Sequence, residues 1–178
     1  NQHFLSYAEL NQRADALAEK LTRLGVGAES LVAISAERSL EQIIAMLAVL
    51  KPDGAYVPVD PAYPDDRLAA ILEDARPRVL LTREHLMPRL STFAGAVMFL
   101  DAAETASMKS APRGAAAAGG AGNLPDVLLP SGSTGKPKGV MLTHRAAVSY
   151  VDWCSETFQP ECDDRFSSHA PFHFDLSI

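Results

Sequence analysis

Residues 131–139 read Ser131-Gly132-Ser133-Thr134-Gly135-Lys136-Pro137-Lys138-Gly139 and combine three glycines, three hydroxyl side chains and two lysines. Glycine lets a backbone approach a ligand closely, and successive N–H groups in such a turn can form an anion-binding concavity. The hydroxyl groups add hydrogen-bond donors, and the lysines add positive charge. The stretch therefore has the chemistry of a loop that holds a polyphosphate.

Apolar segments lie on both sides of this loop, at 127–129 and 140–142, and are typical of short buried strands. The Walker A pattern does not fit, because Pro130 stands where its first glycine is required and Pro137 stands where Ser or Thr must follow Lys136. The residues alone leave an ordinary solvated loop open as the alternative, since clusters of Gly, Ser and Thr are most often loops.

Strands and helices alternate through the part of the chain that precedes this loop. Capping residues Ser6, Ser39 and Asp65 each open a predicted helix, and Gly25 ends the first one. The side chains of the second helix that are expected to face the protein core are Ile43, Ile44, Met46, Leu47 and Leu50. Predicted strands cover residues 31–35, 55–59, 78–82 and 96–100. This alternation predicts an α/β fold with a mostly parallel sheet flanked by helices, in which ligands bind at the carboxyl ends of the strands.

The later part of the chain is less regular. Residues 102–123 include a run of alanine and glycine without an apolar period, which we interpret as a flexible low-complexity excursion within the domain. A helix is predicted to start at Thr143 or His144, and a strand is predicted over 165–170. Asp175 follows an aromatic and apolar run; on the residues alone it is best interpreted as a helix N-cap, and Phe174 as ordinary core.

Composition excludes several classes of function. The 178 residues are 47% hydrophobic and 21% charged, which are globular values, and the net charge of −6 argues against nucleic acid as the main partner. The apolar runs are too short to cross a membrane, and no signal peptide is visible, so we expect a cytoplasmic protein. Cys154 and Cys162 do not have metal-ligand spacing, and neither do the histidines. We therefore predict no metal ligand within the chain. No Ser/His/Asp set stands out, so covalent catalysis by the protein is not indicated.

Four motifs in order resemble those of adenylate-forming, AMP-binding enzymes, most closely the amino-acid adenylation domains of nonribosomal peptide synthetases. The first three are the opening Leu5-Ser6-Tyr7-Ala8-Glu9-Leu10, the segment Leu50-Lys51-Pro52-Asp53-Gly54-Ala55-Tyr56-Val57-Pro58-Val59-Asp60 and the loop 131–139. The fourth is Phe174-Asp175-Leu176-Ser177, which matches F-D-x-S. The resemblance runs from Leu5 to Ile178 and implies that residues 1–178 are the N-terminal part of an adenylation domain whose small C-terminal domain is absent.

The resemblance implies a ligase-type reaction with ATP and Mg²⁺. A substrate amino acid is activated as aminoacyl-AMP and passed to the phosphopantetheine thiol of a carrier protein, as in secondary-metabolite biosynthesis. The residues implied to bind phosphate are Ser131, Gly132, Ser133, Thr134, Gly135, Lys136 and Lys138. Asp175 is implied to hold the α-ammonium group of the amino acid, with Phe174 in the pocket wall. The magnesium-binding glutamate and the catalytic lysine of the family are expected beyond Ile178, so the 178 residues alone are expected to be inactive and to need the remainder of the domain.

Two departures and two alternatives accompany this interpretation. Pro130 replaces the family's usual threonine before the loop, and Pro125-Asp126 replaces its usual Ala-Tyr, so phosphate binding is expected to be weakened or lost in a diverged copy. An acyl- or aryl-CoA ligase of the same superfamily is one alternative, against which Asp175 argues. A non-catalytic remnant or binding module is the other. The activated amino acid and the oligomeric state do not follow from the sequence.

Overall fold

The computed structural model describes residues 4–101, 126–128, 140–168 and 170–172. The predicted phosphate-binding residues 131–138, the pair Phe174 and Asp175, Pro130 and the excursion at 102–123 lie outside the described residues. The bounds of the helices are α1 Tyr7–Arg23, α2 Leu40–Leu50, α3 Asp65–Ala75, the 3₁₀ helix η1 Glu84–Leu90 and α5 His144–Phe158. The bounds of the strands are β1 Leu31–Ser35, β2 Ala55–Pro58, β3 Val79–Thr82, β4 Ala96–Phe99, β5 Asp126–Leu128 and β6 Val140–Leu142.

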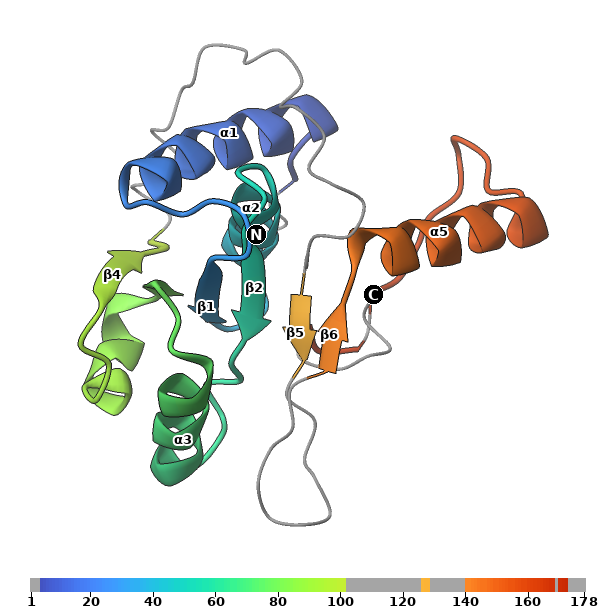
Figure 1. Cartoon of the computed structure of the whole chain (residues 1–178). Helices are drawn as coiled ribbons and strands as arrows, with labels where there is room; N and C mark the ends of the chain where they lie inside the picture. Colours follow the sequence, from blue (N-terminus) through green and yellow to red (C-terminus); the bar gives the residue numbers. More distant parts are fainter. Residues whose placement is uncertain (1–3, 102–125, 129–139, 169, 173–178) are drawn as a thin grey trace.

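The described strands form one sheet in the order β4-β3-β1-β2-β5-β6 (Figure 1). Neighbouring strands from β4 to β5 are parallel, and only β6 runs antiparallel, against β5. The predicted α/β fold with a mostly parallel sheet flanked by helices is therefore confirmed.

Helices cover both faces of the sheet, and the side chains of the central strands alternate between the two. Val32 and Ile34 of β1 join a cluster with α1 and α2, whereas Ala33 between them joins a second cluster with α3. Leu80 of β3 belongs to the α3 cluster, between two residues of the other one. Because successive side chains of a strand point to opposite faces, these buried runs pack on both sides at once.

Local sequence signals explain most helix ends. Ser6 caps α1 in a capping box: its hydroxyl accepts from the Glu9 N–H at 3.2 Å, while a Glu9 carboxylate oxygen accepts from the Ser6 N–H at 2.8 Å. Ser39 caps α2 by accepting from the Gln42 N–H. Gly25, just past the end of α1, has φ +81°, the conformation that glycine adopts at low cost.

Three local predictions were wrong. Asp65 is the first residue of α3 and not its N-cap, because Pro64 holds the cap position and the Asp65 carboxylate turns to Arg89 instead. Leu47 of α2 is 36% exposed, and the buried face of that helix consists of Gln42, Ile44, Ala45, Ala48 and Val49. No strand is formed by the described residues of 165–170, since 165–168 are exposed and pair with no neighbouring strand there.

Candidate functional site

The connectivity creates a crevice between the carboxyl ends of β1 and β2. The chain leaves β1 through α2 on one face of the sheet, and leaves β2 through α3 on the other face, to reach β3 on the far side of β1. The loops after two adjacent strands thus diverge to opposite faces. Such a switch point is where open α/β sheets bind ligands.

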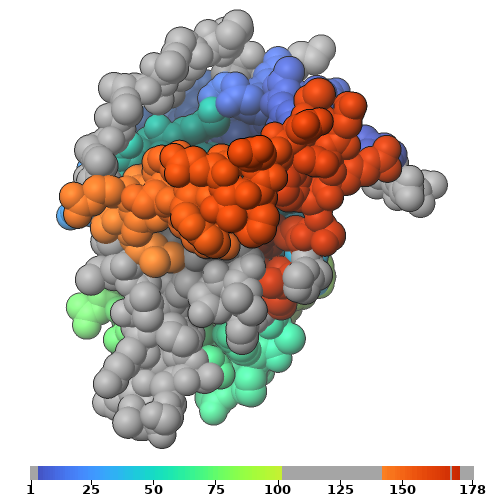
Figure 2. Space-filling view, turned by 90° about the vertical axis from the view of Figure 1, so that its right-hand side faces the viewer, coloured from blue at the N-terminus to red at the C-terminus, as the bar shows by residue number. Residues whose placement is uncertain are grey.

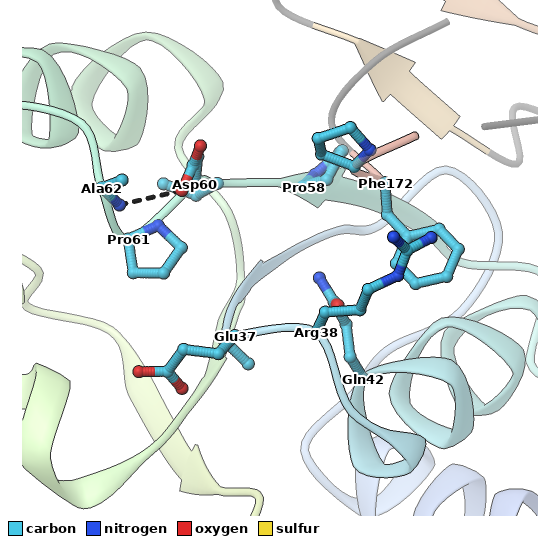
Figure 3. Close-up of a pocket in the computed structure, with 11 residues that line it drawn as sticks. Glu37, Arg38, Gln42, Pro58, Asp60, Pro61, Ala62 and Phe172 are labelled. Atoms are coloured by element: carbon cyan, nitrogen blue, oxygen red, sulfur yellow. Dashed lines mark hydrogen bonds between the residues drawn. The ribbon is translucent and has the colours of Figure 1, made fainter. Parts of the chain in front are cut away.

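A cavity of about 360 Å³ occupies this crevice (Figure 3). Its walls come from the turn after β1, the turn after β2 and a segment far along the chain. The lining residues are Ala36, Glu37, Arg38, Gln42, Pro58, Val59, Asp60, Pro61, Ala62, Pro171 and Phe172. The lining is mostly apolar and includes a small number of polar side chains, as is common for small-molecule sites.

Both predicted ligand-binding segments begin at this edge of the sheet. The parallel register that places Tyr56 of β2 beside Asp126 of β5 brings Leu128 to the carboxyl edge, where β2 also ends. Leu128 pairs with Val140, the first residue of β6, so both anchors of the 129–139 connection lie there. Phe172, which lines the cavity, precedes Asp175 by three residues. The strands predicted on either side of the loop are thus confirmed, as β5 and β6.

The turn after β2 is held in one conformation by several side chains. The Asp60 carboxylate accepts from the Ala62 N–H at 2.8 Å, the dashed line in Figure 3. Arg89 of η1 donates to the Asp65 carboxylate at 2.8 Å and to the carbonyl oxygens of Pro61 and Tyr63. Burial raises the pKa of the Tyr63 hydroxyl, although the nearby Arg67 guanidinium opposes the shift. Hydrogen bonds from Arg89, which does not line the cavity, therefore support the cavity wall formed by residues 60–62.

The turn after β1 is tied to the turn after β3 by charged groups. A Glu37 carboxylate oxygen lies 2.7 Å from Nε2 of His85, and another lies 3.4 Å from Nε of Arg83. Arg83 also pairs with Glu41, at 3.2 Å. Burial alone would raise the pKa of Glu37, but the hydrogen bond with His85, a hydrogen bond with the Glu37 backbone and the nearby charges of His85 and Arg83 together outweigh it and hold the pKa below its ordinary value.

Arg38 and Asp60 are residues of this crevice that the sequence analysis did not single out. The signal was present, because each of them follows a predicted buried strand by one to three residues, at the edge where ligands bind. Among the described residues, no cluster of His, Cys, Asp or Glu could hold a metal ion. Cys154 and Cys162 are free thiols. Within the same part of the chain, no helix has the length and apolar character needed to cross a bilayer.

Fold and crevice together define a doubly wound α/β protein with a cavity at its switch point, and the comparisons identify its family. The family model described as AMP-binding enzyme matches residues 1–178. The chain belongs to the AMP-binding enzyme family.

Relatives and solved structures agree with this assignment. Tyrocidine synthase 3 of Brevibacillus parabrevis is 39% identical over 177 residues, which are 99% of this chain and 3% of that protein. The crystal structure of the nonribosomal peptide synthetase FmoA3 in its AMPPNP-bound form aligns with a TM-score of 0.87 and 30% identity, over 99% of this chain and 18% of the other. Its alpha-methyl-L-serine-AMP-bound form aligns with a TM-score of 0.84 and 30% identity, over 97% of this chain and 19% of the other.

The structure is also similar to that of ATP-bound MatB from Rhodopseudomonas palustris, with a TM-score of 0.83 and 26% sequence identity over 97% of this chain and 36% of that one. The chain thus spans a small part of each of these proteins.

Proposed function

We propose that the chain is the N-terminal part of an amino-acid adenylation domain, residues 1–178, with a low-complexity excursion at about 102–123. The domain activates the carboxylate of an amino acid as aminoacyl-AMP and transfers it to the phosphopantetheine thiol of a carrier protein. One observation carries the proposal. Leu128 and Val140, the residues on either side of the 129–139 connection, lie at the same carboxyl edge of the sheet as Phe172, which precedes the F-D-x-S motif.

The reaction joins the amino-acid carboxylate to the α-phosphate of ATP and releases pyrophosphate. Catalysis of this kind depends on positioning and charge neutralisation. In the proposal, Ser131, Gly132, Ser133, Thr134, Gly135, Lys136 and Lys138 hold the β- and γ-phosphates, and Asp175 accepts hydrogen bonds from the α-ammonium group beside Phe174. Mg²⁺ would neutralise phosphate charge, with its ligand in the remainder of the domain.

Two of the structural relatives support ATP as the nucleotide, because FmoA3 was solved with AMPPNP and MatB with ATP. FmoA3 bound to an aminoacyl-AMP supports an amino acid as the second substrate. Asp175, which is proposed to hold the α-ammonium group, argues against the alternative of an acyl- or aryl-CoA ligase.

The test is pyrophosphate exchange by the complete domain, with each amino acid offered in turn. We expect ATP–pyrophosphate exchange with one amino acid or a small related set. Lys138→Ala should raise the KM for ATP about tenfold or more, since a hydrogen bond to a charged group contributes about 1.5–3 kcal/mol, while the KM for the amino acid stays within about twofold.

The matched control is Lys20→Ala, a lysine in the last turn of α1, the helix that precedes the amino end of β1. Exchange driven by carboxylic acids without an amino group would favour the CoA-ligase alternative. A folded complete domain that exchanges with neither class of acid would favour a non-catalytic binding module.

A further inference from the structure

Arg38 connects the turn after β1 to a segment more than a hundred residues later in the chain. Its Nη2 donates to the Ser168 hydroxyl at 2.7 Å and to the Ala170 carbonyl oxygen at 3.0 Å. Its guanidinium carbon lies 5.3 Å from the centre of the Phe172 ring, and the two side chains lie together in Figure 3. One side chain thus contacts three of the described residues between 168 and 172.

The helix that precedes the segment 168–172 is α5, and it contributes little packing there. No residue of α5 is buried, and the residues 161–168 that follow it are exposed. Ala170, the next residue that the structure describes, is buried at 9% exposure, and its carbonyl oxygen is the one that Arg38 binds. The chain therefore returns to the crevice at the point that Arg38 holds.

The held segment continues directly into the F-D-x-S motif. Asp175 lies three positions after Phe172, a reach of at most about 11 Å of extended chain. The position of residues 168–172 therefore limits where the motif can start, and misplacing a substrate-positioning group by about 1 Å can be costly for activity.

We infer that Arg38 is a positioning residue for amino-acid binding: it fixes residues 168–172 against the carboxyl ends of β1 and β2, and thereby sets where the F-D-x-S motif starts. The inference rests on the proposed function. Arginine suits the role because its planar guanidinium can lie against an aromatic ring while Nη2 donates to both acceptors, whereas a lysine ammonium is a compact charge without that planar surface.

The experiment compares Arg38→Ala and Arg38→Lys with Arg23→Ala in the complete adenylation domain. Arg23 is an exposed arginine of α1 whose partner is Glu19 of the same helix, so its loss serves as the matched control. Pyrophosphate exchange gives the KM for the amino acid and for ATP separately. Hydrogen–deuterium exchange of peptides covering 168–172 reports on the segment itself, and the thermal midpoint reports on global stability.

Arg38→Ala should raise the KM for the amino acid roughly three- to tenfold, the loss expected for one net hydrogen bond, and leave the KM for ATP within about twofold. Amide exchange at 168–172 should accelerate while the thermal midpoint stays close to that of Arg23→Ala. Arg38→Lys should fall between the wild type and Arg38→Ala, because it retains a charged donor but not the planar guanidinium beside Phe172.

If the wild type is active and Arg38→Ala has the same two KM values as Arg23→Ala, the inference about Arg38 is overturned while the proposed function stands. Equal rises in the two KM values, together with a lower thermal midpoint, would reduce Arg38 to a structural residue and also overturn it. A folded wild type that shows no exchange with any amino acid would instead overturn the proposed function, and with it the substrate role of Arg38.

Discussion

At the scale of single residues, charged side chains hold the loops that surround the crevice. Glu37 bridges the turn after β1 to Arg83 and His85 after β3, and Arg89 gathers the turn after β2 by three hydrogen bonds. Sequence patterns place such residues in loops but do not pair them, because each partner is supplied by a different strand–loop unit. The pairing follows only once the strand order is known.

The pH dependence of stability should reveal the Glu37 contacts. Because the pKa of Glu37 is lowered in the folded protein, its contribution to the free energy of unfolding is complete above its ordinary pKa and is lost as the pH falls through the folded value. The Glu37 side chain is 50% exposed, so the contribution is small, about 0.2–1 kcal/mol.

We therefore predict that Glu37→Gln lowers the free energy of urea unfolding slightly at pH 6 and not at pH 3. Glu73→Gln, a change at an exposed residue of α3, is the control and should give no such difference between the two pH values. An effect of Glu37→Gln that is the same at both pH values would show that the ion pairs do not cause it.

At the scale of the elements, local signals placed most helices and strands, and tertiary packing decided the rest. The capping box at Ser6 and the glycine after α1 were sufficient to bound that helix, because both act within a few residues. The inward face of α2 was misjudged, since large side chains were assigned to the core, whereas Ala45 and Ala48 are fully buried and Leu47 is not. Close packing of α2 against α1 and the sheet favours small residues there.

The turn between α2 and β2 shows the same close packing at a glycine. A Cβ atom on Gly54 would lie 2.9 Å from both Cγ1 of Val26 and the carbonyl oxygen of Val49. A Cβ atom on Gly27 would have the Pro52 carbonyl oxygen as its nearest neighbour, at 4.0 Å. The two glycines therefore provide a matched pair, one crowded and one open.

Gly54→Ala should lower the free energy of unfolding by about 1–3 kcal/mol, the usual cost of forcing an extra carbon into a packed site. Gly27→Ala should be neutral, or stabilise by up to about 1 kcal/mol by restricting the unfolded chain. Urea unfolding of the two variants beside the wild type decides this. Equal losses in both variants would mean that contact with Val26 and Val49 does not set the cost.

At the scale of the whole molecule, the alternation of strands and helices predicted the fold class, but not the strand order on which the crevice depends. The order β4-β3-β1-β2-β5 places the switch point between β1 and β2, and only then do Arg38, Asp60 and Phe172 come together. The loop at 131–138 and the pair Phe174 and Asp175 were predicted from their motifs, and their roles remain predictions. The strand predicted over 165–170 was wrong because that segment is held by side chains such as Arg38 and not by a neighbouring strand.

Much of α5 is exposed in the described part of the chain. Apolar side chains at its surface include Val148, Tyr150, Val151 and Trp153, each more than half exposed, and Figure 2 shows this helix running across the face turned toward the viewer.

The relatives extend well beyond the matched region, which is 18% of the FmoA3 chain. The experiments on activity therefore require the complete domain.

Asp175 is proposed to select an amino acid by its ammonium group, and this role can be measured with a pair of substrates that differ only in that group. Pyrophosphate exchange is measured in the complete domain with the preferred amino acid and with the same acid lacking its amino group, for the wild type and for Asp175→Ala. We expect the wild type to prefer the amino acid strongly, and kcat/KM for the amino acid to fall about tenfold or more in the variant while the KM for ATP changes little. A wild type that uses the deaminated acid equally well, or an Asp175→Ala variant with an unchanged preference, would contradict the proposed role of Asp175.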